Sequence, residues 1–258
     1  MGASKAGLAP GAGVALITLF DEDGTLLTAA TAELATGLVE AGAASVLVAG
    51  TSGEFWALAD DERVALTRAV RTAVPGHVPV IGHVGGVPVD RAVALAAAMN
   101  DVGVAGMLAL PLGIAADDLA SFYDAIVDAA DVPVAAYHLP QAGANVALDV
   151  LAELGVTAIK DSSGDGERLA EEVLGLGIET YTGAPTLLGL AHDIGAAGGI
   201  LGIANVRPEL ARQAFEGDRQ ALRDLAAESA QSSSNFPAGL KGMTSSRWGT
   251  PSHLRAAG

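Results

Sequence analysis

The sequence of 258 residues contains no cysteine. Disulfide bonds and thiolate chemistry are therefore excluded, and the cysteine count does not indicate a redox compartment. Aromatic residues make up only 4% of the chain although 50% of it is hydrophobic, so a core has to be built from aliphatic side chains. The length suits one large domain or two small ones, and α/β barrels of this size commonly form a single domain.

Basic residues are scarce, with 14 Lys and Arg against 30 Asp and Glu and a net charge of −16. This balance disfavours nucleic acid and anionic membranes as partners, and we expect neither. No stretch reaches the roughly 18 apolar residues of a membrane helix. The opening MGASKAGLAPGAG is too short and too weakly apolar for a signal peptide, so we expect a cytoplasmic protein. A solvated acidic surface is the simplest explanation of the charge; a salty cytoplasm is the alternative.

Short apolar runs alternate along the chain with Ala- and Leu-rich amphipathic segments. The runs are bounded by Gly or Pro and are mostly continuous, which is typical of parallel strands covered on both faces. The pattern predicts strands at residues 14–20, 45–50, 78–84, 106–111, 133–139, 157–161, 178–183 and 199–204. It predicts helices at residues 31–41, 59–74, 88–101, 116–130, 148–154, 166–174, 185–194 and 208–215.

Eight strand–helix units in about 200 residues predict an α/β fold of the (β/α)8 TIM-barrel type. A doubly wound sheet is the alternative, but Gly11 and Gly13 precede the first expected strand and do not form a dinucleotide fingerprint. We expect residues 1–205 to form the catalytic barrel. Residues 206–258 would add the last barrel helix and a C-terminal helical extension of the same domain. In that extension we expect a helix at 218–230, a serine-rich turn at 232–234 and a tail in which Trp248 is a packing anchor.

Lysine occurs only three times, as Lys5, Lys160 and Lys241. Lys160 ends an apolar run within the stretch TAIKDSSG. Burial disfavours the charged form of an amine, and the neutral amine attacks carbonyls to form Schiff bases. The alternative is that Lys160 pairs with Asp161 or extends past the strand end into solvent.

Catalytic groups of a parallel barrel lie at the carboxyl ends of its strands. The second strand is followed by GTSGE, in which the hydroxyls of Thr51 and Ser52 and nearby backbone N–H groups could hold a carboxylate. A tight turn with local hydrogen bonds is the alternative. The fifth strand ends in AAYHLP, where Tyr137 could relay protons or be a core tyrosine. Gly183, after the seventh strand, and residues 202–205, after the eighth, could leave space and backbone carbonyls near a ligand.

The remaining polar residues favour no second site. The five histidines lack metal-ligand spacing such as HExxH, so we expect no metal. His83 with Gly85 and Gly86 could form a phosphate loop, but their spacing fits no phosphate-binding motif. Glu54 could be a base, although a structural carboxylate that holds the turn is the preferred interpretation.

Six segments, taken in order and at suitable spacing, resemble the dihydrodipicolinate synthase / N-acetylneuraminate lyase family of class I, Schiff-base aldolases. They are the TLF of residues 18–20 with DG at 23–24, GTSGE, AAYHLP, AIKDSSGD, GAAGGILGIAN at 195–205 and FPAGLKGM at 236–243. The matches span nearly the whole chain, and it is their combination that carries the resemblance.

The resemblance implies a (β/α)8 barrel with extra C-terminal helices, usually as a homotetramer. It implies that Lys160 forms a Schiff base with pyruvate or another 2-keto acid, with Tyr137 as proton shuttle and Thr51 connecting the Tyr137 hydroxyl onward. Ser52, with nearby N–H groups, would hold the keto acid's carboxylate. The backbone at Ile200 would lie near the Schiff base. The mechanism requires no metal, and we expect no cofactor.

Two departures from the family bear on the substrate. The family's dihydrodipicolinate synthases usually carry a carboxylate-binding arginine where this chain has Ala142, and losing such a clamp weakens binding of a charged second substrate. They also carry a tyrosine after the fourth strand, whereas here the next tyrosine is Tyr123, on an expected helix. Both departures disfavour lysine-pathway synthesis.

We therefore expect a pyruvate-type aldolase that acts on a 2-keto-3-deoxy sugar acid or a similar compound, with pyruvate and an aldehyde or sugar acid as its partners. A dehydratase or dihydrodipicolinate synthase using the same imine, a non-catalytic keto-acid binder and a metal-dependent aldolase are the alternatives. We expect specificity to reside in the loops at residues 113–118 and 141–145. The C-terminal region is shorter than usual in the family, so both a dimer and a tetramer stay open.

Overall fold

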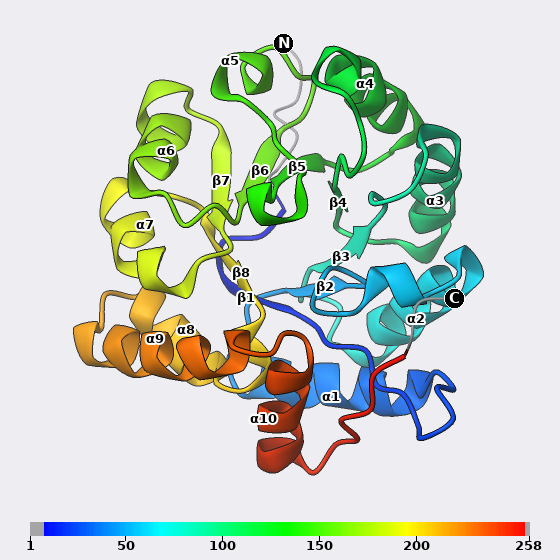
Figure 1. The fold of residues 1–258 in the computed structure, drawn as a ribbon, viewed down its shortest axis with the longest axis vertical. Coiled ribbons are helices and arrows are strands. Elements are labelled where there is room, and N and C mark those ends of the chain that lie inside the picture. The colour runs from blue at the N-terminus through cyan, green and yellow to red at the C-terminus, as the bar shows by residue number, and fades with distance from the viewer. Residues whose placement is uncertain (1–7, 256–258) are drawn as a thin grey trace.

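The computed structural model describes residues 8–255 and shows a ring of strands surrounded by helices (Figure 1). Lys5 and the expected domain limits at residues 1 and 258 lie outside this range. The strands are β1 (Gly11–Ala15), β2 (Val46–Val48), β3 (Val80–His83), β4 (Gly106–Ala109), β5 (Val134–His138), β6 (Ala158–Asp161), β7 (Glu179–Thr182) and β8 (Gly198–Leu201). The helices are α1 (Thr28–Glu40), α2 (Asp60–Ala73), α3 (Val89–Val102), α4 (Leu119–Ala129), α5 (Leu148–Leu151), α6 (Gly166–Ala170), α7 (Leu188–Ile194), α8 (Pro208–Phe215), α9 (Arg219–Ser233) and α10 (Ala238–Trp248).

Each strand pairs in parallel with the next, and β8 pairs with β1 to close the barrel. The predicted (β/α)8 architecture with C-terminal helices is confirmed. Figure 1 shows α9 beside α8 and α10 near α1, outside the ring. Among residues 8–255, no helix combines the length and apolar character needed to cross a membrane.

The position of β1 corrects one expectation from the sequence, because Gly11 and Gly13 lie within this strand and not before it. Both glycines allow close packing of neighbouring chains. A Cβ on Gly13 would lie 2.1 Å from the Ser45 hydroxyl, and a Cβ on Gly198 of β8 would lie 1.9 Å from the Gly11 carbonyl oxygen. The close approach of the Gly11 backbone excludes any larger side chain at Gly198, so strand packing requires this glycine.

Helix α9 corrects a second expectation, because Ser232 and Ser233 belong to its last turn and not to a serine-rich turn after it. The hydroxyls of both residues donate to the carbonyl oxygen of Ser229, each at 2.9 Å. Serine side chains satisfied in this way are compatible with a helix. Trp248, at the end of α10, donates from its indole nitrogen to the Asn205 carbonyl at 2.8 Å and packs on the core, as expected of an anchor.

Alternate residues of the strands fill the inside of the barrel and are buried, among them Ala15, Leu47, Ile81, Leu108 and Tyr181. The other face of each strand packs against the surrounding helices. Strands covered on both faces explain why the sequence reads as continuous apolar runs. The carboxyl ends of these strands form the end of the barrel at which the predicted site residues lie.

Candidate active site

Tyr137 and Lys160 face each other across the neighbouring strands β5 and β6, where they are register partners. The Lys160 Nζ donates to the Tyr137 Oη at 3.2 Å and lies 4.4 Å from the centre of the phenol ring. The two side chains are only 3% and 2% exposed. Parallel pairing of two strands, each ending in a reactive group, thus brings an amine and a phenol into contact in a nearly water-free site.

Thr51 extends this contact through the turn that follows β2. Its Oγ1 lies 3.1 Å from the Tyr137 Oη, and either hydroxyl can donate. The turn is closed by the Gly53 N–H, which donates to the Gly50 carbonyl at 3.0 Å, and the Thr18 hydroxyl donates to the Gly53 carbonyl at 2.7 Å. Lysine, phenol and hydroxyl therefore form one continuous hydrogen-bonded row.

The pKa of Tyr137 lies below its ordinary value despite burial. Burial alone raises the pKa of this phenol, but the charge of Lys160 and hydrogen bonds from Thr51, Ser162 and Lys160 together lower it by more. Burial raises the pKa of the other two tyrosines, Tyr123 and Tyr181. Tyr137 is the phenol best prepared to exchange a proton at its strand end.

Asp161 does not pair with Lys160, so that interpretation of the TAIKDSSG stretch is wrong. Successive side chains of a strand point to opposite faces. Asp161 points outward, where its carboxylate accepts from the Ser163 N–H at 2.6 Å and from the Ser163 hydroxyl at 3.0 Å. Nor does Lys160 reach solvent past the strand end, because its ammonium is buried against Tyr137.

Asp161 belongs to a buried group of ionisable residues behind the sheet, which we call the outer cluster: His138, Asp161, Arg168 and Glu172. The Arg168 Nε lies 2.9 Å from Glu172 Oε1 and 3.6 Å from Asp161 Oδ2. Arg168 also donates to the Val146 carbonyl at 2.8 Å, and the Val146 N–H donates to His138 Nδ1 at 3.0 Å. The cluster therefore joins the segment that follows β5 to the one that follows β6.

A π-helical turn, Glu171–Gly175, continues α6 and carries Glu172 into this cluster. Burial, and then the nearby charge of Asp161, raise the pKa of Glu172 to about 8 against the opposing effect of Arg168. The pKa of His138 is lowered by burial and by Arg168. Arg168 is thus the cation nearest to both buried carboxylates, Asp161 and Glu172. Of the two, Glu172 binds a proton readily because its pKa is raised.

A cavity of about 510 Å³ opens above the lysine. Its lining includes all six predicted site residues: Thr51, Ser52, Tyr137, Lys160, Gly183 and Ile200. A Cβ on Gly183 would lie 1.9 Å from the Ser162 hydroxyl, so this position after β7 has to be glycine if Ser162 is to keep its place. The barrel therefore gathers residues from five strand ends around one space.

Sequence reasoning missed part of this cavity. Gln141 and Ser162 line one part of it, and Ser229, Ser232 and Ser233 of α9 line another, with Phe236 just beyond the helix. The run of serines at 232–234 was the available signal, but nothing in the sequence placed it near the barrel mouth. Of the two loops expected to set specificity, residues 113–118 do not line the cavity, and residues 141–145 contribute Gln141 alone.

Glu54, the last residue of the GTSGE turn, is a structural carboxylate. It is buried and forms an ion pair with the buried Lys241 of α10. The Lys241 ammonium also donates to the His253 carbonyl at 2.8 Å, and the Arg255 N–H donates to Glu54 Oε2 at 3.3 Å. The C-terminal segment is thereby attached to the turn that carries Thr51.

The segment around His83 does not form an open phosphate loop. The His83 ring is fully buried, its centre 4.9 Å from that of Phe55, and burial lowers the pKa of its imidazole well below the usual value. A Cβ on Gly85 would lie 2.0 Å from the Leu110 backbone nitrogen, so Gly85 is required by packing. Among the residues that the structure describes, no group of three His, Asp or Glu is placed to hold a metal ion.

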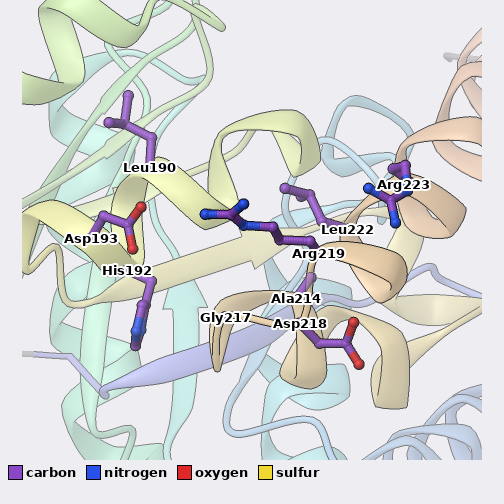
Figure 2. Close-up of a pocket in the computed structure, with 10 residues that line it drawn as sticks. Leu190, His192, Asp193, Ala214, Gly217, Asp218, Arg219, Leu222 and Arg223 are labelled. Atoms are coloured by element: carbon purple, nitrogen blue, oxygen red, sulfur yellow. The ribbon is translucent and has the colours of Figure 1, made fainter.

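A second hollow, of about 530 Å³, lies on the outside of the barrel and is lined by residues of α7, the end of α8 and α9 (Figure 2). Its polar lining residues include His192, Asp193, Arg219 and Arg223. No strand residue and none of the predicted site residues lines it. The chemistry predicted from the sequence therefore belongs to the cavity above Lys160.

A closed (β/α)8 barrel with a buried lysine beside a phenol at its strand ends is the architecture of a class I aldolase or lyase. The sequence matches the profile of the Dihydrodipicolinate synthetase family over residues 9–241, and the chain belongs to this family. The resemblance drawn from the six segments is confirmed.

Named relatives agree with this assignment. An uncharacterized DapA-like lyase of Halobacterium salinarum is 35% identical over 221 residues, which cover 81% of this chain and 73% of that protein. The 4-hydroxy-tetrahydrodipicolinate synthase of Corynebacterium aurimucosum is 30% identical over 228 residues, covering 84% and 76%. The chain is therefore an enzyme of the lyase class.

Solved structures share the fold. The YagE protein of Escherichia coli K12, in complex with pyruvate, aligns with a TM-score of 0.88 at 20% identity, over 96% of this chain and 92% of that one. The N-acetylneuraminate lyase of Fusobacterium nucleatum, also complexed with pyruvate, aligns with a TM-score of 0.85 at 20% identity, over 98% and 92%. At this sequence identity the alignments show only that the fold is shared.

Proposed function

We propose that the protein is a Schiff-base aldolase that cleaves or forms a 2-keto-3-deoxy sugar acid or a similar 2-keto acid, with pyruvate as the keto-acid product or substrate. The observation that carries the proposal is the row of hydrogen bonds from Lys160 through Tyr137 to Thr51, above which the cavity opens. An amine in contact with a phenol of lowered pKa has a partner that can accept and return protons.

In the cleavage direction, neutral Lys160 attacks C2 of the keto acid, and loss of water gives a protonated imine. Tyr137 takes the proton of the C4 hydroxyl as the C3–C4 bond breaks. The aldehyde leaves, and the electron pair of that bond moves into an enamine that the imine nitrogen stabilises. Protonation at C3 and hydrolysis then release pyruvate and restore the lysine. The hydroxyls of Thr51 and Ser52, with nearby N–H groups, hold the keto acid's carboxylate.

Reduction of the imine with borohydride tests the covalent step. We expect incubation with pyruvate and borohydride to add the reduced pyruvyl group to the peptide that contains Lys160. Lys241 is an internal control, because it is buried in an ion pair with Glu54 and should stay unmodified. If the folded protein carries no adduct on the peptide that contains Lys160, the proposal is contradicted.

A second candidate is synthesis of 4-hydroxy-tetrahydrodipicolinate through the same imine. It is favoured by the 30% identity of the chain to the 4-hydroxy-tetrahydrodipicolinate synthase of Corynebacterium aurimucosum. It is disfavoured by Ala142 at the position of the family's carboxylate-binding arginine. Incubation of the trapping-competent enzyme with pyruvate and either aspartate semialdehyde or a neutral hydroxyaldehyde, followed by product analysis, separates the two candidates.

We also propose that the enzyme is a homo-oligomer. Trp56, Val89 and Leu112 are exposed large hydrophobic residues, at 42%, 41% and 37%, and they lie beyond three adjacent strands, β2, β3 and β4. Exposed apolar residues that follow neighbouring strands are candidates for a subunit contact. Light scattering after chromatography should report a dimer or tetramer, and the paired changes Trp56→Ser and Leu112→Ser should reduce it to a smaller species.

A further inference from the structure

The lining of the cavity contains one basic residue and no acidic residue. Among the cavity-lining residues, Lys160 is the only one of the Lys, Arg, His, Asp and Glu types, and the others are hydroxyl, amide, glycine or apolar residues. Under the proposed function, Lys160 becomes the protonated imine and its charge is matched by the keto acid's carboxylate. A second anion on the substrate would lie in this cavity without a cation, and an unpaired charge removed from water is costly.

Two of the three serines of α9 that line this space face it as hydrogen-bond acceptors. We call Ser229, Ser232 and Ser233 the serine wall. The hydroxyl protons of Ser232 and Ser233 are both engaged by the Ser229 carbonyl, at 2.9 Å. A serine oxygen that donates its one proton keeps two lone pairs. Ser232 and Ser233 can therefore only accept hydrogen bonds from a ligand, while the Ser229 hydroxyl can both donate and accept.

Gln141 repeats this arrangement near the β5 and β6 strand ends. Its amide nitrogen donates to the carbonyl oxygens of Ser162 and Ser163, at 3.2 and 3.3 Å. Its side-chain carbonyl oxygen is an acceptor. Acceptors on both the serine wall and Gln141 match a ligand that brings donors, and they repel a carboxylate or a phosphate, which brings none.

The remaining lining is apolar and includes Leu139, Pro185, Ile203 and Phe236. The Phe236 ring is 46% exposed beside the serine wall. An aromatic face next to acceptors suits a carbon chain that has C–H groups on one side and hydroxyl groups on the other. Such a chain is neutral and polyhydroxylated.

We infer that the serine wall and Gln141 set the specificity of the enzyme for an aldehyde that is uncharged and carries hydroxyl groups. This inference rests on the proposed Schiff-base aldolase function and adds to it the residues that recognise the second substrate. It keeps Gln141 of the loop after β5 as a specificity determinant, adds α9, which lies outside the eight strand–helix units, and gives no part to the loop after β4.

The test compares three aldehydes in condensation with saturating pyruvate: glyceraldehyde, propionaldehyde and glyceraldehyde 3-phosphate. They share a three-carbon chain and differ in hydroxyl groups and charge. We expect kcat/KM for glyceraldehyde to exceed that for propionaldehyde by about tenfold or more, because propionaldehyde lacks the hydroxyl groups that would bond to the serine wall and Gln141. Glyceraldehyde 3-phosphate should be the poorest of the three.

The variant Ser229→Ala/Ser233→Ala should lower kcat/KM for glyceraldehyde by about tenfold, as expected from losing two hydrogen bonds, and should leave propionaldehyde within about twofold. Ser234→Ala is the matched control. Ser234 is the next serine along the chain, its hydroxyl donates to the Gln231 carbonyl at 2.8 Å, and it does not line the cavity.

Borohydride trapping with pyruvate, measured on the same preparations, distinguishes failure of the specificity inference from failure of the proposed Schiff-base function. Trapping that is normal in the double variant, together with a glyceraldehyde preference that collapses, supports the inference. Normal trapping with an unchanged preference, or with the phosphorylated aldehyde preferred, overturns the inference and leaves the Schiff-base function standing. Failure of trapping in the parent enzyme overturns both.

Discussion

On the inner face of β5 and β6, Tyr137 and Lys160 share a hydrogen bond below the cavity, while one residue further along each strand His138 and Asp161 point the other way, toward Arg168. The inner pair holds one cation against a phenol. The outer cluster holds two carboxylates around one arginine and binds a proton readily.

The difference between the two faces shows how a reactive lysine can directly precede a buried acid in the same strand and still avoid it. A carboxylate against Lys160 would stabilise its protonated form and oppose attack on a carbonyl. The alternation of side chains along a strand directs Asp161 to the outer face, where Arg168 compensates its charge. Four predictions test this difference between the inner pair and the outer cluster, from the largest expected effect to the smallest.

Tyr137→Phe should abolish most of the chemistry on the inner face. Removal of a proton-transferring group costs 10²- to 10⁴-fold, so we expect kcat to fall by about 10³-fold while borohydride still traps pyruvate on Lys160. Tyr181→Phe is the matched control, because the Tyr181 hydroxyl accepts from the Ala9 N–H at 2.8 Å and lies outside the cavity lining. Equal losses in both variants would mean that Tyr137 is only a packing residue.

Arg168→Met should break the outer cluster. Asp161 would then be a buried carboxylate without its cation, and removal of one partner of a buried ion pair costs about 3 kcal/mol in free energy of unfolding. Urea denaturation at neutral pH measures this loss. Arg91→Met is the control: the Arg91–Asp60 pair is 49% and 36% exposed, so its loss should cost less than about 1 kcal/mol. Equal destabilisation by the two changes would contradict the importance of the cluster.

Glu172→Gln should change how stability depends on pH. Because the pKa of Glu172 is raised to about 8 in the folded protein, this carboxyl contributes stability that is fully present below its ordinary pKa of 4.5 and is lost as pH rises toward 8. The variant lacks this loss. Its stability relative to the parent should therefore rise by roughly 1 kcal/mol per pH unit across that window, as followed by denaturation at several pH values. A difference that stays constant with pH would refute the raised pKa.

Thr51→Val should raise the pKa of Tyr137, because the Thr51 hydroxyl is one of the hydrogen bonds that lower it. Tyrosinate absorbance gives a direct measurement, since the pKa values of Tyr123 and Tyr181 are raised and Tyr137 should ionise first. We expect a rise of about 0.5–1 pH unit, the equivalent of one hydrogen bond. Thr51→Ser keeps the hydroxyl and should leave the titration unchanged; a shift in both variants would assign the effect to packing.

The inner face could be predicted from the sequence and the outer cluster could not, for a physical reason. Thr51, Tyr137 and Lys160 each end a strand or directly follow one, and a closed parallel barrel brings all strand ends to one rim. Locating the strands was therefore enough to group them, even though the strand limits were too long by a few residues. The position of Gly183 followed from the same rule, whereas that of Ile200 came from the family resemblance alone.

Other contacts depend on local geometry that residue type does not encode. Arg168 and Glu172 are four residues apart, the spacing of neighbours on a helix, so their contact could be predicted. Nothing in residues 166–175 signals the π-helical turn or the burial of the pair beside Asp161. The serines of α9 meet the cavity only because the C-terminal helices pack back over the barrel, which is a tertiary event. Ser232 and Ser233 were expected in a turn because serine disfavours helix interiors, but their hydroxyls bond within the helix.

The ion pair between Glu54 and Lys241 and the contact of Arg255 with Glu54 also carry a consequence for biosynthesis. The Thr51 turn is translated early, but Arg255 follows Glu54 by 201 residues. A ribosome adds roughly 5–20 residues per second, so the turn exists for about ten seconds or more before its buried carboxylate has a partner. During that interval the Glu54 carboxylate is hydrated and not paired with Lys241. The contacts that attach the Thr51 turn to the C-terminal segment can therefore form only after almost the whole chain has been synthesised.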